Sequence, residues 1–221
     1  MDFKTIMIRM KGDPVSEAYA SYCAESWQGF DLRFYNAITP ERLTRRDLGT
    51  AYDKVKFGTR GNGRKLTETE AACFFSQYFL WMKSAVENIP ILVLEHDAYL
   101  VKPEFIKFDP RFEVTFYGQH SMEAVMYNPV FAKRLIRHIH QNRVTGPMNL
   151  VDQLLGFFNK GTQSRHALPH ARFIGQGAPV KSVIDPNIGT SVDHDGSTAD
   201  RLKKDGDLFK IVDLKKSGHY T

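Results

Sequence analysis

The chain has 221 residues, of which 42% are hydrophobic and 25% charged, a composition typical of a globular protein large enough to bury its own core. Two cysteines are too few for a disulfide scaffold, and no apolar run reaches the roughly 20 residues of a membrane span. Because the first residues also lack the apolar stretch of a signal peptide, we expect a cytoplasmic protein.

The positive charge is concentrated in two segments of the chain. Thirty Lys and Arg residues against 25 Asp and Glu residues give a net charge of +5. Residues 42–65 contain eight basic residues and two acids, and residues 131–143 contain four basic residues and no acid. Such clusters are typical of proteins that bind a nucleotide or a nucleic acid, and an ordinary solvated surface is an equal alternative.

The first 35 residues predict a strand, a helix and a second strand. Residues 5–10 are mostly apolar, and Gly12-Asp13-Pro14 ends the strand. Ser16 and Glu17 are typical of a helix N-terminus, and residues 30–35 alternate as in a half-buried strand. This order indicates an α/β domain.

The next segments predict a loop and a long helix. Residues 54–65 combine three glycines with basic residues, which favours a flexible loop. Thr67 with Glu70 three positions later is a capping box, so we expect a helix from there to about Glu87.

An acidic group follows a strand predicted to be buried on both faces. Residues 91–94 are all apolar, and Glu95-His96-Asp97 comes directly after them. Ligand sites of open α/β sheets lie at the carboxyl ends of strands. In an extended segment Glu95 and Asp97 project the same way, a spacing that suits one hard divalent cation. An ordinary acidic turn is the alternative.

The second half of the chain holds two further candidate sites. We expect a strand over residues 112–117, a helix over residues 129–140 and another helix around Asp152. Asp152 alone is more typical of a helix cap. The Asp193-His194-Asp195 triplet offers a metal ligand on a flexible segment, with a solvated turn as the alternative. The chain contains no phosphate-binding, dinucleotide-binding or nucleophile-elbow motif.

Several of these segments together resemble glycosyltransferase family 25. Residues 66–81 (LTETEAACFFSQYFLW) resemble its L-T-x-x-E-x-A-C-x-x-S-H-x-x-x-W helix, and residues 90–98 (PILVLEHDA) resemble its I-L-E-D-D-A strand. Residues 124–132, Val151-Asp152 and residues 173–184 are similar to its later segments.

The resemblance spans roughly residues 3–185. It implies an α/β, GT-A-like nucleotide-sugar-binding fold, with a mixed, mostly parallel central sheet flanked by helices. The domain would comprise residues 1–185, and residues 186–221 would be a polar, basic tail that closes as a lid over the donor site.

The resemblance also implies a reaction and a set of site residues. The reaction is transfer of a sugar from a nucleotide-sugar donor, a UDP-sugar, with Mn²⁺ or Mg²⁺ on the donor diphosphate. Glu95 and Asp97 match the outer acids of the metal motif, His96 replaces its central Asp, and His194 would complete the metal ligands. Asp152, by its family position, would be the catalytic base. The residues expected to bind the donor are Arg9, Lys11, Lys65, Thr67, Glu70, Gln77 and Gln176.

The acceptor remains open between two classes at this point. One is a lipopolysaccharide or capsule glycan. The other is a hydroxymethylated pyrimidine in double-stranded phage DNA, which the basic segments favour and which requires base flipping. A third hypothesis is a non-catalytic module that binds a nucleotide sugar or a nucleic acid and keeps the fold.

Overall fold

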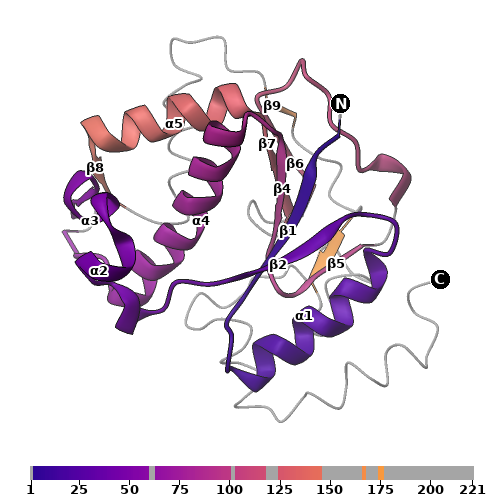
Figure 1. The fold of residues 1–221 in the computed structure, drawn as a ribbon, viewed down its shortest axis with the longest axis horizontal. Helices are drawn as coiled ribbons and strands as arrows, with labels where there is room; N and C mark the ends of the chain where they lie inside the picture. The colour runs from indigo at the N-terminus through magenta and orange to yellow at the C-terminus, as the bar shows by residue number, and fades with distance from the viewer. Residues whose placement is uncertain are drawn as a thin grey trace.

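A six-stranded mixed sheet forms the centre of the molecule (Figure 1). The computed structural model describes residues 2–59, 63–100, 103–117, 124–145, 166–167 and 174–176. Within these ranges β1 pairs in parallel with β2 and β4, and β6 pairs in parallel with β9, whereas β7 is antiparallel to both β4 and β6. In spatial order the strands are β2 (Leu32–Asn36), β1 (Lys4–Arg9), β4 (Ile91–Leu94), β7 (Ala124–Tyr127), β6 (Val114–Phe116) and β9 (His166–Ala167).

Helices cover both faces of this sheet. Helix α1 (Pro14–Ser26) lies on one face, where its Cys23 packs with Met7 and Leu94. Helices α4 (Glu68–Glu87) and α5 (Pro129–Gln141) lie on the other face (Figure 1). Successive side chains of a strand point to opposite faces of the sheet, so neighbouring strand residues pack in the core on opposite sides of it. The predicted α/β architecture, with a mixed, mostly parallel central sheet flanked by helices, is confirmed.

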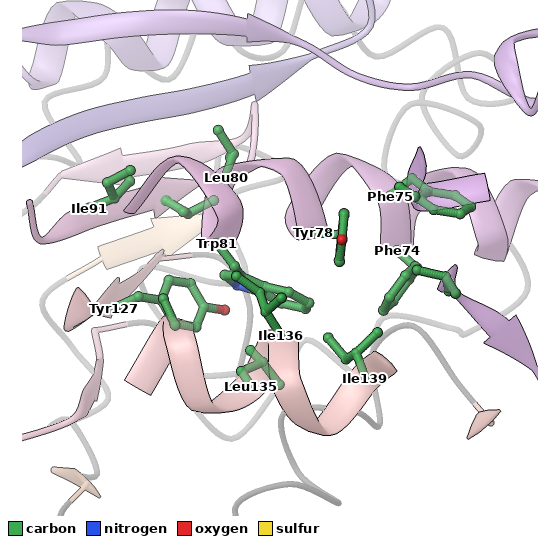
Figure 2. Packing of buried hydrophobic residues seen from close by; sticks show 14 of the residues in the cluster. Phe74, Phe75, Tyr78, Leu80, Trp81, Ile91, Tyr127, Leu135, Ile136 and Ile139 are labelled. Atoms are coloured by element: carbon green, nitrogen blue, oxygen red, sulfur yellow. The ribbon is translucent and has the colours of Figure 1, made fainter. Parts of the chain in front are cut away.

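Aromatic side chains fill the space between α4, α5 and the sheet. Trp81 on α4 is fully buried, and its ring lies 5.9 Å from that of Tyr127 and 6.0 Å from that of Phe74. Figure 2 shows these rings beside Leu135 and Ile139 of α5, in one continuous cluster. The aromatic residues of α4 therefore belong to the core or pack against it.

Helix α4 begins with the predicted capping box. The Thr67 hydroxyl oxygen accepts the N–H of Glu70 at 3.2 Å, and the Glu70 carboxylate accepts the N–H of Thr67 at 2.8 Å. The second Glu70 oxygen accepts a hydrogen bond from Arg64 at 2.7 Å. The helix ends at Glu87, where Asn88 adopts the left-handed conformation with φ 55°.

We expect Thr67→Ala to lower the free energy of unfolding by about 1 kcal/mol, because the N–H of Glu70 loses its acceptor. Urea unfolding followed by circular dichroism measures the change. Thr69→Ala in the same turn is the matched control and should change stability much less. Equal losses for the two variants would contradict the capping role.

Short elements connect β2 to α4 and bring the two basic segments together. They are a single 3₁₀ turn (Pro40–Arg42), α2 (Arg45–Leu48), α3 (Thr50–Lys54) and β3 (Lys56–Phe57). Strand β3 pairs in parallel with β8 (Arg143–Val144), with Lys56 opposite Arg143. The prediction of a loop over residues 54–65 is therefore wrong at its start, because a long-range pairing orders it.

The remaining elements lie beside the central sheet, and one helix begins earlier than the sequence predicted. Strand β5 (Ala98–Leu100) pairs antiparallel with β10 (Ile174–Gln176), and a 3₁₀ turn spans Pro103–Phe105. Helix α1 begins at Pro14 rather than Ser16, because the Asp13 side chain accepts the N–H groups of Val15 and Ser16. None of the helices in the described part of the chain has the length and apolarity to cross a membrane. The predicted boundary at residue 185 lies outside the described residues.

Candidate active site

The acidic residues Glu95 and Asp97 lie in a tight turn between β4 and β5. The Glu95 carbonyl accepts the N–H of Ala98 at 3.1 Å, which closes the turn. The extended geometry assumed for Glu95 and Asp97 is therefore wrong. The two acids nevertheless remain two residues apart in the same turn, where burial and then the charge of Asp97 raise the pKa of Glu95.

The polar atoms of this turn are buried without protein partners. Asp97 is 2% exposed, and its Oδ1 has no hydrogen-bond partner among the described residues. The Nε2 of His96 is likewise buried and unpartnered within them. Removal from water, and then the charge of Asp97, raise the pKa of the half-buried Glu95 to about 8. Such an arrangement is costly unless a ligand satisfies it.

Helices α1 and α4 flank the turn from opposite faces of the sheet. On the α1 side the Tyr19 ring lies 6.1 Å from that of His96. Burial, and then the charge of Asp97, raise the pKa of Cys23 on the same helix. On the α4 side, desolvation and then the charges of Glu95 and Glu70 raise the pKa of Cys73 to about 11. The turn thus lies at the carboxyl end of β4 between two helices.

Three predicted donor-binding residues lie close to this turn. Arg9 ends β1, two residues after Met7, which is the register partner of Leu94. Gln77 lies one helical turn after Cys73, is 8% exposed, and carries an Oε1 that has no partner in the described ranges. Gln176 pairs with Ala98, the residue after Asp97. Segments far apart in the sequence therefore meet at the acidic turn.

The Arg9 side chain has an aromatic platform. Its guanidinium carbon lies 4.4 Å from the centroid of the Phe34 ring on β2, and Phe34 remains 42% exposed. The Nε of Arg9 is buried and makes no hydrogen bond within the described residues. A guanidinium held in this way retains donors for an anionic ligand.

The other predicted site residues lie elsewhere or outside the described ranges. Lys11 is exposed in the turn after β1, and Glu70 is engaged in the capping box and with Arg64. Lys65 and Thr67 line a separate pocket. Asp152 and His194 lie outside the described residues, so their roles stay predictions.

This pocket has a volume of about 780 Å³ and lies beside the first turns of α4. Its walls come from α2, α3, β3, α4 and β8. The sequence predicted Lys65 as a donor-binding residue and the basic segments as a binding surface. It did not show that Tyr52 and Arg143 belong to the same pocket. Only the β3–β8 pairing brings them together. The residues that line it are Leu43, Leu48, Tyr52, Val55, Phe57, Gly58, Thr59, Lys65, Leu66, Thr67, Glu68, Ala71, Phe75 and Arg143.

Comparison with solved structures gives similar chains at low identity. A glycosyltransferase involved in glycosylation of the major capsid of PBCV-1 has a TM-score of 0.42 and 12% identity, covering 76% of this chain and 81% of that one. Mouse xyloside xylosyltransferase 1 has a TM-score of 0.40 and 11% identity, covering 76% and 85%. GlyE of Streptococcus pneumoniae TIGR4 has a TM-score of 0.39 and 12% identity, covering 75% and 46%.

Comparison of sequences gives a family and a relative. Part of the chain is 32% identical over 83 residues to the lipooligosaccharide biosynthesis protein lic2B of Haemophilus influenzae. The match covers 38% of this chain and 29% of the relative, so the chain spans less than a third of that protein's length. The model of glycosyltransferase family 25 (LPS biosynthesis protein) matches residues 19–154. Since this match covers well over half of the chain, the protein belongs to glycosyltransferase family 25.

Proposed function

We propose that the protein transfers a sugar from a UDP-sugar to a hydroxyl group of a glycan, with a divalent cation held at the turn between β4 and β5. The observation that carries this proposal is the buried, unpartnered carboxylate of Asp97 beside the half-buried Glu95, at the carboxyl end of β4 in a family 25 chain. A buried carboxylate beside a half-buried one, neither with a cationic partner among the described residues, favours a ligand that supplies positive charge.

The donor set fits Mn²⁺ or Mg²⁺ shared with a nucleotide. Glu95 and Asp97 would hold the ion through carboxylate oxygens, which both ions prefer. No group of three or more His, Cys, Asp or Glu side chains in the described residues could hold a metal alone. Mg²⁺ characteristically takes one or two carboxylates together with substrate phosphates and water. When bound, the ion would neutralise the charge that builds on the departing diphosphate.

The chain's own residues would bind and orient the donor beside this turn. Arg9, fixed against Phe34, would donate hydrogen bonds to the diphosphate. The Oε1 of Gln77, which is unpartnered within the described residues, would contact the donor from α4. Asp152 would take the proton of the acceptor hydroxyl, and His194 would add a metal ligand. These two roles rest on the family position and on sequence alone.

We expect Arg9→Gln to weaken UDP binding about tenfold, because one charge-assisted contact to the diphosphate is lost. Calorimetric titration of UDP in the presence of Mn²⁺ measures the effect. Arg33→Gln on the neighbouring strand removes an equal charge from an exposed pair with Asp31 and serves as control. Equal UDP affinities for wild type and Arg9→Gln would remove Arg9 from the donor site.

A glycan acceptor is better supported than duplex DNA. The family and the relative are both named for lipopolysaccharide or lipooligosaccharide biosynthesis. Several cations of residues 42–65 also pair with acids, which interrupts the basic surface that a duplex would need. These pairs are Arg42–Asp47 at 4.0 Å, Arg45–Asp53 at 2.7 Å, Arg46–Asp47 at 3.9 Å and Arg64–Glu70 at 2.7 Å.

A release assay tests the proposed reaction. Liberated UDP is measured from UDP-glucose and UDP-galactose, with Mn²⁺ or EDTA, and with truncated lipopolysaccharide or hydroxymethylcytosine duplex DNA as acceptor. We expect metal-dependent release that the glycan stimulates. Stimulation by the duplex alone would assign the acceptor to DNA. Nucleotide binding without release from either donor would favour the non-catalytic module.

A further inference from the structure

The pocket beside α4 combines apolar walls with an exposed aromatic ring. Leu48 and Phe75 are each 3% exposed and form part of a rigid wall, because both belong to the main core cluster. Tyr52 on α3 is 50% exposed and lines the same space. A volume of about 780 Å³ is large enough for one or two sugar rings.

Two cations on the lining of this pocket have no acidic partner among the residues that the structure describes. Lys65 is held by a backbone bridge to Thr59, and Arg143 lies on β8 beside β3. Neither makes an ion pair within the described residues, whereas the nearby Arg64 pairs with Glu70. Glu68 is the one acid among the lining residues, so the lining carries a net positive charge.

We propose that this pocket binds an anionic saccharide, a sugar that carries a phosphate or a carboxylate group. Lys65 and Arg143 would bind the anionic group, and the Tyr52 ring would pack against the apolar face of the sugar. The hydroxyls of Thr59 and Thr67 and the Glu68 carboxylate supply donors and acceptors for sugar hydroxyls. These polar groups make the lining unsuitable for an acyl chain, which cannot satisfy them.

The location of the pocket makes it a distal acceptor subsite, an assignment that rests on the proposed function. Glu68, Ala71 and Phe75 face the pocket, whereas Cys73 on another face of the same helix lies near Glu95. Residues 68 and 73 are about 8 Å apart along the helix axis. In this proposal a branched or extended glycan would pass around the N-terminus of α4, with its reacting hydroxyl at the turn and its anionic sugar in the pocket.

Binding measured without donor or metal tests the subsite independently of turnover. Glucose 6-phosphate and sialic acid are the probes, and glucose and inorganic phosphate are the comparisons, followed by ligand-observed NMR titration of the full chain. We expect both charged sugars to bind at least about tenfold more tightly than glucose or phosphate. Equal binding of glucose 6-phosphate and inorganic phosphate would overturn the saccharide assignment. Displacement of the probe by UDP would show that the pocket belongs to the donor.

Substitutions of pocket residues test whether the probe binds in this pocket. Arg143→Gln and Tyr52→Ala should each weaken glucose 6-phosphate binding about fivefold to tenfold. Lys83→Gln, which removes an exposed cation paired with Glu87 at the other end of α4, should leave it unchanged. Unchanged binding in Arg143→Gln would overturn the proposal.

Discussion

Replacement of Asp97 by asparagine is expected to reduce metal-dependent sugar transfer about a thousandfold. The amide has nearly the same volume as the carboxylate, so the buried turn between β4 and β5 is retained while one negative metal ligand is lost. We expect turnover to decrease and the free energy of unfolding to change little. The reason is that the Oδ1 of Asp97 makes no hydrogen bond to any residue that the structure describes. Release of UDP at saturating donor and Mn²⁺ measures the effect.

A matched substitution distinguishes this role from a general loss of charge. Asp31→Asn makes the same change at an exposed residue just before β2, where Leu32 pairs with Thr5 at the amino end of the parallel strands. We expect that variant to retain wild-type turnover. Comparable turnover in Asp97→Asn and Asp31→Asn would remove Asp97 from the catalytic machinery.

The metal-free protein is expected to lose stability as the pH rises from about 5 to 8, relative to Glu95→Gln. Desolvation and the charge of Asp97 raise the pKa of Glu95 to about 8 in the folded state, well above its unfolded value. In this pH interval the folded protein therefore keeps a proton on Glu95 that the unfolded chain has released. The contribution is fully present below the unfolded pKa and is lost as the pH rises through the folded pKa, at up to about 1.4 kcal/mol per pH unit.

Thermal or urea unfolding of wild type and Glu95→Gln in EDTA, at several pH values, measures this difference. Glutamine does not titrate, so its curve lacks this contribution, and the variant should become the more stable protein near pH 8. Addition of Mn²⁺ with UDP should restore wild-type stability, because the ligand binds only the folded chain. Parallel pH profiles for the two proteins would show that Glu95 ionises normally in the folded state.

The sequence predicted the elements whose signals are local. Helix α4 was predicted from its capping box and its apolar run, and the structure shows both, from Glu68 to Glu87. Strand β4 was predicted as buried because Ile91–Leu94 has no polar residue, and all four residues are buried. Position after this strand was also enough to predict that Glu95 lies at the carboxyl edge of the sheet.

Features that depend on long-range contacts could not be predicted in this way. The turn at Glu95 differs from the assumed extended segment because β5 begins at Ala98 and pairs with β10, some 75 residues later. The pocket at Lys65 depends on pairing between β3 and β8, two strands of two residues each. Such short strands carry no periodic pattern, so neither the pocket nor the ion pairs of residues 42–65 could be derived from composition.

Binding of Mn²⁺ at the turn of Glu95 and Asp97 tests the central claim most directly. Electron paramagnetic resonance of free Mn²⁺ during titration counts bound ions in the presence and absence of UDP. We predict one site that forms tightly only with UDP present, because the two carboxylates and the proposed His194 ligand need diphosphate oxygens to complete the coordination. This site should be lost in Asp97→Asn and retained in Asp31→Asn. UDP-dependent Mn²⁺ binding of equal affinity in wild type and Asp97→Asn would contradict the assignment.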